Sequence, residues 1–256
     1  MLLNYSEQGS GHPVFLVHGL FGSLSNLGNL ARHLAADYRV FSVDLRNHGD
    51  SPHDDEMSLF SMAEDIIELM NLLQLSTAHF VGHSLGGKVA MQLAMNDADR
   101  VKSLVVVDIA PVSYEDNNIH IINSLYNLSN IFIKNRKAAD SYLSDQGVEL
   151  SVRAFLLKNL CRVSADTFGL KLNIKAIKQH YKTQIAVAPK GENFVGPCLF
   201  LKGEKSTYIE SQYLPIIQSI FPASSVHIVE AVGHWLHAEK PELFNQLVSQ
   251  FIGEIS

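Results

Sequence analysis

The sequence predicts an α/β protein in which a mostly parallel sheet is flanked by helices. Strand-like and helix-like segments alternate along both ends of the chain, which is the pattern of strands joined by crossover helices. The strand-like runs are apolar throughout, as expected of strands that are covered on both faces. With 46 % hydrophobic and 18 % charged residues over a length of 256, the chain can also form a large buried core.

The expected elements of the sheet follow one another in a regular order. Strands are predicted at 14–17, 39–44, 79–81, 104–107, 198–201 and 226–229, and helices at 24–36, 58–73, 89–95, 213–221 and 241–252. Helical periodicity is clearest in 58–73, where four apolar residues recur at intervals of three or four. The strongest strand signal is 104–107, which is apolar and rich in valine.

Residues 112–195 interrupt this alternation. Short amphipathic stretches recur in the segment, at 121–131, 149–160 and 170–185. Because the strand pattern before and after it completes one core, we expect a helical cap inserted into a core of residues 1–111 and 196–256. The segment carries 11 basic and 7 acidic residues, against 9 and 19 in the rest of the chain. Solvated helix faces can explain the excess of basic residues in the segment. The excess also fits a cationic cover that favours substrates with an anionic tail.

The composition argues against several classes of protein. The formal net charge of -6 disfavours a nucleic-acid-binding protein, which usually has a basic face. The two cysteines, Cys161 and Cys198, cannot form a disulfide framework, so we expect a cytoplasmic protein. The chain has no signal-peptide pattern at its start and no apolar run of membrane-spanning length. We therefore expect neither nucleic acid nor a membrane as a partner, and the oligomeric state is left open.

A G-x-S-x-G motif lies between a predicted strand and a predicted helix, as Gly82-His83-Ser84-Leu85-Gly86. In this context the motif is typical of a sharp turn that raises a nucleophilic serine above the sheet. The turn brings neighbouring backbone too close for side chains at the two glycines, and the helix that follows directs its positive dipole end toward developing negative charge. We therefore predict that Ser84 is a nucleophile.

A serine nucleophile needs a base to take its proton, and His234 is the best candidate. His234 follows the last predicted strand, so it should lie at the same carboxyl edge of the sheet as Ser84. His83 is a poor candidate because neighbouring residues on a strand point to opposite faces. His79 and His83 do not form a helical metal pair, and the sequence has no H-E-x-x-H motif. We expect neither a metal nor an organic cofactor.

Two backbone N–H groups are expected to stabilise the oxyanion. A glycine-bearing turn, HGLFG at 18–22, leaves the first predicted strand and offers the N–H of Leu20. The second donor is the N–H of Leu85, the residue after the nucleophile. Such donors have to come from turns, because N–H groups within a sheet are already bonded.

Together these features resemble the α/β-hydrolase fold, and four segments in order resemble the bacterial YbfF-type esterases. The segments read HGLFGS at 18–23, DLRNHGDS at 44–51, VDIAP at 107–111 and GHWLHAEKP at 233–241. The resemblance covers nearly the whole chain. It implies hydrolysis of carboxylic esters, with acyl-CoA thioesters among the candidate substrates, and we expect the helical cap to follow the sixth strand.

Two residues are candidates for the acid that supports His234. Most α/β-hydrolases carry an aspartate in the loop that reads Gly203-Glu204-Lys205-Ser206 here, so a serine stands in the expected place. The resemblance implies Asp108, at the end of the strand 104–107, which keeps the order Ser, Asp, His along the chain. Glu204 is the alternative, since it lies in the usual loop. A strand-terminal Asp could also simply cap a turn.

The remaining expectations concern the pocket and the reaction. Phe21, Phe155 and Trp235 are candidates for an apolar acyl pocket, and Asp44-Leu45-Arg46 is expected to hold the loop that follows it by ion pairing. The predicted reaction is two-step acyl transfer through an acyl-enzyme on a small-molecule ester or thioester. A carbon–carbon bond hydrolase or lyase would use the same serine and histidine, and a non-catalytic binding module of the same fold is the remaining alternative.

Overall fold

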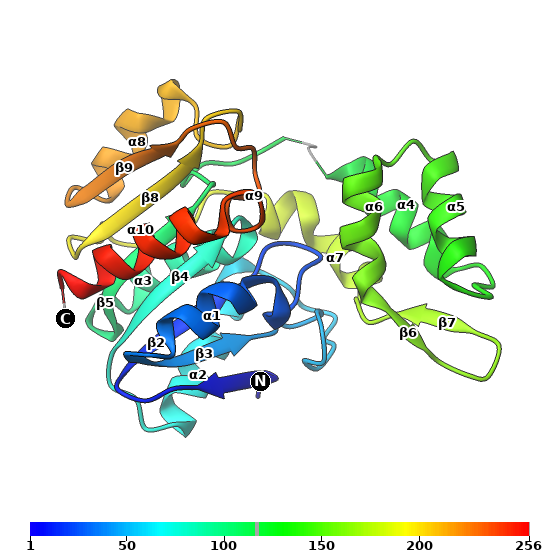
Figure 1. Ribbon diagram of the computed structural model, residues 1–256, viewed down its shortest axis with the longest axis horizontal. Helices are drawn as coiled ribbons and strands as arrows, with labels where there is room; N and C mark the ends of the chain where they lie inside the picture. The colour runs from blue at the N-terminus through cyan, green and yellow to red at the C-terminus, as the bar shows by residue number, and fades with distance from the viewer. Residues whose placement is uncertain (116–117, 256) are drawn as a thin grey trace.

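A seven-stranded sheet organises the computed structural model, which describes residues 1–115 and 118–255 (Figure 1). Its strand order is β1-β3-β2-β4-β5-β8-β9. The strands are β1 (Tyr5–Gln8), β2 (His12–Val17), β3 (Tyr38–Val43), β4 (Ala78–His83), β5 (Val101–Val107), β8 (Cys198–Gly203) and β9 (Ser224–Val229). β1 pairs with β3 in antiparallel register, and the other neighbouring strands of this sheet are parallel. The predicted mostly parallel sheet is confirmed.

Helices cover both faces of this sheet. One face packs against α1 (Gly28–Leu34) and α10 (Pro241–Gly253), which lie side by side in Figure 1. The opposite face packs against α2 (Leu59–Leu72), α3 (Leu85–Asn96) and α8 (Leu214–Ile220). Because crossover connections place helices on the faces of a parallel sheet, the strand residues between them are buried on both sides.

Aromatic side chains strengthen the core beneath α2 and α3. Phe15 pairs in register with Phe41 on one neighbouring strand and with Phe80 on the other. Their ring centroids are 5.1 Å and 5.4 Å from that of Phe15, in stacked geometry, and all three side chains are fully buried. Such offset pairs add to the free energy gained by burial alone, and they hold three central strands together.

The strands and helices predicted for the core are present, with bounds that differ by a few residues. β1 was not predicted, because Tyr5–Gln8 is a short, half-exposed edge strand without an apolar run. The short helix α9 (Leu236–Glu239) was not predicted either. Both elements are too short to show a periodicity.

The segment 112–195 is mainly helical, as expected. Its helices are α4 (Ile119–Ser129), α5 (Arg136–Asp145), α6 (Leu150–Leu156) and α7 (Ile174–His180). It also contains a two-stranded hairpin of β6 (Leu160–Arg162) and β7 (Phe168–Leu170), which the sequence did not predict because three-residue strands show no alternation. In Figure 1, α4, α5, α6 and this hairpin form a group beside the sheet.

The place of this segment along the chain corrects one expectation. It follows β5, the fifth strand of the described residues, and the prediction that it follows the sixth strand was wrong. The reason is that a single antiparallel strand, β1, precedes the parallel strands in the part of the chain that the structure describes.

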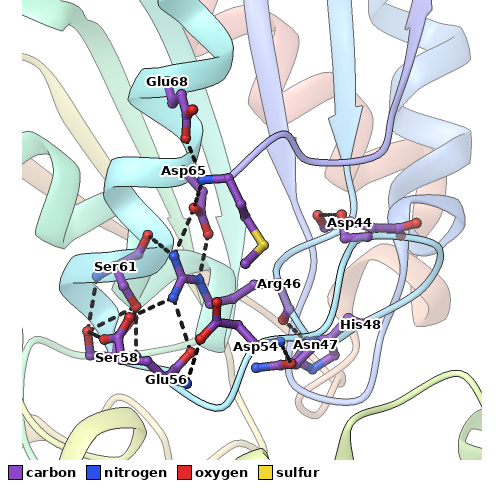
Figure 2. Close-up of polar contacts among 12 residues, drawn as sticks. Asp44, Arg46, Asn47, His48, Asp54, Glu56, Ser58, Ser61, Asp65 and Glu68 are labelled. Atoms are coloured by element: carbon purple, nitrogen blue, oxygen red, sulfur yellow. Dashed lines mark hydrogen bonds and ion pairs between the residues drawn. The ribbon is translucent and has the colours of Figure 1, made fainter.

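The loop after β3 is held by a buried ion pair, which Figure 2 shows. Arg46 donates to Asp65 of α2 through Nε, at 2.6 Å, and through Nη2, at 2.9 Å. Its Nη1 lies 2.7 Å from a carboxylate oxygen of Glu56. Asp44 contributes differently, since its carboxylate accepts the N–H groups of Leu24 and Asp50 at 2.7 Å and 2.9 Å. The predicted ion pairing is therefore confirmed for Arg46, whereas the carboxylate of Asp44 binds backbone N–H groups.

We predict that the two acidic partners of Arg46 contribute unequally to stability. The side chain of Asp65 is 1 % exposed and that of Glu56 is 58 % exposed. Asp65→Asn should lower the free energy of unfolding by about 3 kcal/mol, because it removes the buried counter-charge of the guanidinium and leaves the exposed one. Glu56→Gln should lower it by less than about 1 kcal/mol. Urea unfolding measures both variants, and equal losses would contradict a dominant role for the buried partner.

Candidate active site

Ser84 lies in the sharp turn between β4 and α3, as predicted. Its φ of 53° is in the left-handed region, which is unfavourable for a residue with a side chain. A Cβ atom at Gly82 would lie 2.3 Å from the carbonyl oxygen of Gly86, and one at Gly86 would lie 2.2 Å from that of Val17. The turn therefore requires glycine at both positions of the motif, for the reason that the sequence suggested.

The structure brings Asp108 and His234 together, although the inserted segment and two further strands separate them along the chain. Asp108 follows β5 with a φ of 52°, and His234 lies between β9 and α9. The Nδ1 atom of His234 is 2.7 Å from Oδ2 of Asp108. The Asp108 side chain is fully buried and that of His234 is 22 % exposed. A carboxylate at this distance holds the imidazole in the tautomer with hydrogen on Nδ1.

The serine that replaces the expected aspartate also contacts Asp108. The hydroxyl of Ser206 donates to Oδ2 of Asp108, and the N–H of Gly203 donates to Oδ1 at 2.9 Å. The loop that usually carries an acid thus supplies donors to an acid on the neighbouring strand. This contact accounts for the departure from the usual loop sequence.

Glu204, the alternative acid, points elsewhere. It is exposed, and its carboxylate accepts the N–H of Ala231 at 2.8 Å. Nδ1 of His234 is bonded to Asp108 instead. Of the two acids that the sequence left open, the geometry favours Asp108.

The glycine-bearing turn after β2 lies against the serine. A Cβ atom at Gly19 would be 3.3 Å from Cβ of Ser84 and 3.0 Å from Nδ1 of His83. Leu20 and Ser84 line the same pocket, and Leu85 is the first residue of α3. The two residues whose N–H groups are expected to bind an oxyanion therefore both adjoin Ser84.

A pocket of about 800 Å³ lies beside the turn that carries Ser84. Its lining includes Ser84 and His234 together with the three predicted apolar residues, Phe21, Phe155 and Trp235. The ring centroids of Phe155 and Trp235 are 6.3 Å apart, so the inserted segment and the loop after β9 meet here. Such a mainly apolar pocket with a few convergent polar groups is typical of a small-molecule site.

Comparison with known proteins identifies the family. Residues 12–145 match the family described as the alpha/beta hydrolase fold. The chain belongs to this family.

The resemblance to known esterases extends over nearly the whole of this chain. Esterase YbfF of Escherichia coli (strain K12) is 35 % identical, over 97 % of this chain and 96 % of that protein. The sn-1-specific diacylglycerol lipase ABHD11 of Xenopus tropicalis is 36 % identical, over 97 % of this chain and 80 % of that protein. A solved structure of a marine microorganism esterase superposes with a TM-score of 0.92 at 36 % identity, over 98 % of this chain and 99 % of that one.

Two residues of this site have contacts that the sequence analysis did not predict. Tyr208 stacks on the imidazole of His234, with ring centroids 4.2 Å apart and planes at 29°. His83 is buried, and its Nε2 donates to the backbone carbonyl of His234 at 2.9 Å. Burial, followed by the neighbouring His237 and His234, lowers the pKa of His83 well below its usual value. His83 therefore supports the loop that carries His234 and is not free to act as a base.

The sequence held a partial signal for each of these contacts. Tyr208 follows the substituted acid position, Ser206, by two residues, but only the fold places its ring on His234. His83 belongs to the motif itself, and its partner is 151 positions away. Contacts over such separations leave no local pattern in a single sequence.

Residues 1–115 and 118–255 offer neither a metal site nor a membrane-spanning helix. No three side chains of the metal-binding types His, Cys, Asp and Glu are grouped so that they could hold an ion. Among the same residues, no helix combines the length and apolar character needed to cross a bilayer.

We predict that acid weakens the folded state through buried histidines beside the site. Burial lowers the pKa of His18 to about 4, and burial followed by the charge of His18 lowers that of His48 to about 3. Below pH 6.5 the unfolded chain takes up protons that the folded chain does not. The free energy of unfolding should therefore fall between pH 6.5 and 4, by about 1.4 kcal/mol per pH unit for each histidine.

Urea unfolding at pH 7, 6 and 5 measures this slope. His48→Gln should reduce the slope by about 1.4 kcal/mol per pH unit, which corresponds to one proton. His33→Gln, at an exposed position, should leave the slope unchanged. Equal slopes in wild type and His48→Gln would contradict the prediction.

Proposed function

We propose that the protein is a serine esterase in which Ser84, His234 and Asp108 form a catalytic triad. The observation that carries the proposal is the 2.7 Å bond between His234 and the buried Asp108, beside a pocket that is lined by His234 and by Ser84 on its strained turn. The names esterase and lipase of the similar proteins support hydrolysis of ester bonds by this chain.

The reaction follows from the tautomer of His234. With hydrogen on Nδ1 bound to Asp108, Nε2 has a free lone pair and removes the proton of Ser84 as its Oγ attacks the ester carbonyl. The N–H groups of Leu20 and Leu85 stabilise the oxyanion, and His234 then protonates the leaving alcohol. Water repeats the sequence on the acyl-enzyme and releases the acid. None of these steps calls for a metal or an organic cofactor.

Asp108 acts by charge and by orientation. Its negative charge stabilises the imidazolium that forms when His234 accepts the proton. The hydroxyl of Ser206 and the N–H of Gly203 hold the carboxylate in place and compensate for its complete burial. Tyr208, stacked on the imidazole, limits movement of the ring.

The pocket favours an ester with an apolar acyl part. Its apolar lining includes Leu20, Ile121, Val152, Leu156 and the three aromatic residues named above. Arg32 and Lys158 also line it, so an anionic group on the leaving alcohol or thiol would find cations nearby. Carboxylic esters are the primary proposed substrates, and acyl-CoA thioesters are the second candidate on the strength of these two cations.

We propose further that residues 112–195 form a cap over a core of residues 1–111 and 196–256. The segment contributes Phe155 and Lys158, among others, to the pocket that contains Ser84. Its return to the core is tied to α3 by Lys88, whose buried ammonium donates to the carbonyls of Ala186 and Val187 at 2.7 Å and 2.6 Å. Entry of a substrate would then involve some opening of the cap.

Two other functions remain as alternatives to ester hydrolysis. A carbon–carbon bond hydrolase or lyase would use the same three residues, so the geometry alone does not separate it from an esterase. A binding module would keep the pocket without a reactive serine, and the bonded His234–Asp108 pair argues against this alternative.

We predict that the wild type hydrolyses p-nitrophenyl esters and that Ser84→Ala lowers kcat/KM by about 10⁴-fold or more. A fluorophosphonate should label Ser84 in the wild type, and Ser164→Ala, at an exposed serine, should retain both labelling and activity. Acyl-CoAs measured in the same panel compare thioesters with oxygen esters. A wild type that is neither labelled nor active would support a binding module.

We predict that the acid can be identified by exchanging carboxylates for amides. Asp108→Asn should lower kcat by about 10⁴-fold, because the imidazole loses its orienting charge. Glu204→Gln should stay within about threefold of the wild type, and Ser206→Ala should cost about tenfold, since it removes one donor to Asp108. The assignment fails if Glu204→Gln abolishes turnover while Asp108→Asn is mild.

A further inference from the structure

Two buried histidines connect the turn after β2 to the loop after β3. The Nδ1 atom of His18 lies 2.8 Å from the carbonyl oxygen of Gly19, and its Nε2 accepts the N–H of Leu45 at 3.1 Å. His48 reaches back from the other loop, where its Nε2 accepts the N–H of Phe21 at 3.2 Å. The two rings adjoin, with centroids 5.1 Å apart. Both side chains are buried, so these bonds are not exchanged with water.

The bonding partners assign one neutral tautomer to each ring. Nδ1 of His18 faces a carbonyl oxygen, which only accepts, so Nδ1 carries the hydrogen and Nε2 presents its lone pair to Leu45. His48 is arranged in the same way, since its Nδ1 lies 2.9 Å from the carbonyl oxygen of Arg46 while Nε2 accepts from Phe21. Both rings thus use one nitrogen as a donor and the other as an acceptor.

The bond from His18 sets the direction of the Leu20 N–H. The carbonyl of Gly19 and the N–H of Leu20 belong to one planar trans peptide group, in which they point in opposite directions. The Gly19 oxygen accepts from His18 and also from the N–H of Gly22, at 2.9 Å. With the oxygen held by two donors, the N–H of Leu20 is directed away from His18.

The bond from His48 holds the next peptide group. Phe21 has a φ of 63°, in the left-handed region, where a bulky side chain is unfavourable. Its N–H is bonded to His48, and its carbonyl accepts the side-chain amide of Asn159, at 2.8 Å, from the inserted segment. Both sides of the unfavourable residue are therefore fixed by buried polar groups.

The loop that carries His48 is itself anchored. Arg46 binds Asp65 of α2 (Figure 2). The N–H of His48 donates to the carbonyl of Leu45 at 3.0 Å. Movement of His48 would require breaking this buried ion pair or distorting the loop. The connection therefore runs from α2 through the loop after β3 to the turn beside Ser84.

We infer that His18 and His48 are positioning residues that orient the peptide bearing the Leu20 N–H toward the oxyanion formed at Ser84. This inference rests on the proposed esterase function. It assigns a role to the DLRNHGDS segment, which the triad leaves unexplained. Neither histidine touches the reacting atoms, and both act through the backbone of residues 19–21.

Paired amide substitutions separate positioning from mere core packing. The amide of asparagine approximates the place of Nδ1 and that of glutamine the place of Nε2. His18→Asn and His48→Gln should keep the bond to the turn, whereas His18→Gln and His48→Asn should lose it. We expect the two disruptive variants to lower kcat about 10- to 100-fold with KM within about threefold, because the lost interaction is made in the transition state. The two conservative variants should retain kcat within about fivefold.

The control is His79, which is equally buried and lies at the start of β4, where its Nδ1 is 2.6 Å from the hydroxyl of Ser103. His79→Asn and His79→Gln should lower the melting temperature without a change in kcat. The inference is overturned if Asn and Gln lower kcat equally at positions 18 and 48, or if kcat follows the melting temperature across all six variants.

A measurement on the wild type tests the inference even if some variants fail to fold. The ¹⁵N chemical shifts of the imidazole nitrogens should show hydrogen on Nδ1 in both His18 and His48, and hydrogen on Nε2 in either would overturn the inference. Failure of the proposed function is seen separately, as a wild type that is not labelled by a fluorophosphonate at Ser84.

Discussion

The fully buried carboxylate of Asp108 determines how the loops at the carboxyl edge of the sheet are arranged. A charge without solvent is unfavourable unless hydrogen bonds and an opposite charge compensate for it. Here the donors are the Gly203 N–H at the end of β8, the Ser206 hydroxyl in the loop after β8, and His234 in the loop after β9. Satisfying one carboxylate thus draws three separate parts of the chain to one point. The pocket forms where they meet Ser84.

Several residues near the carboxyl edge of the sheet have backbone angles in the left-handed region. Phe21, Asn47, Ser84, Asp108 and Ala231 all have φ between 52° and 66°, and each lies just beyond a strand of the sheet. Such conformations cost about 1–3 kcal/mol each for residues other than glycine, so they persist where the surrounding packing leaves no alternative. The stacked aromatic core and the helices on both faces provide that rigidity. A rigid edge can hold polar groups in directions that a flexible loop would not maintain.

Much of the fold was predictable because its signals are local. The apolar runs of β2, β4, β5 and β8 and the apolar stripe of α2 are properties of consecutive residues, and they were read correctly. The β6–β7 hairpin and β1 were missed, because short strands carry too few residues to show a period. The prediction that the inserted segment follows the sixth strand was wrong as well, because five strands precede it in the described residues.

The candidate site also has parts that could be predicted from local sequence and parts that could not. Ser84 and the turn at 18–22 were predicted, because glycine spacing and the flanking elements are visible in the sequence. The choice between Asp108 and Glu204 stayed open, since both residues follow strands and either side chain has suitable chemistry. The structure favours Asp108 because β5 and β8 are neighbours, so that the loop with Ser206 turns its donors toward the strand beside it. The contacts of His18, His48 and Tyr208 could not be predicted, because they join residues that lie far apart along the chain.

The sequence by itself determined the α/β class, the strand–turn–helix around Ser84 and the family resemblance, because periodicity and glycine spacing act over a few residues. Only the tertiary structure decided which carboxylate meets His234, which aromatic ring stacks on it and which nitrogen of each buried histidine carries hydrogen. These depend on strand order and on burial, which bring together residues as far apart as Asp108 and His234, separated by 126 positions. In a buried site each polar atom needs a partner, and the identity of that partner is a property of the assembled fold.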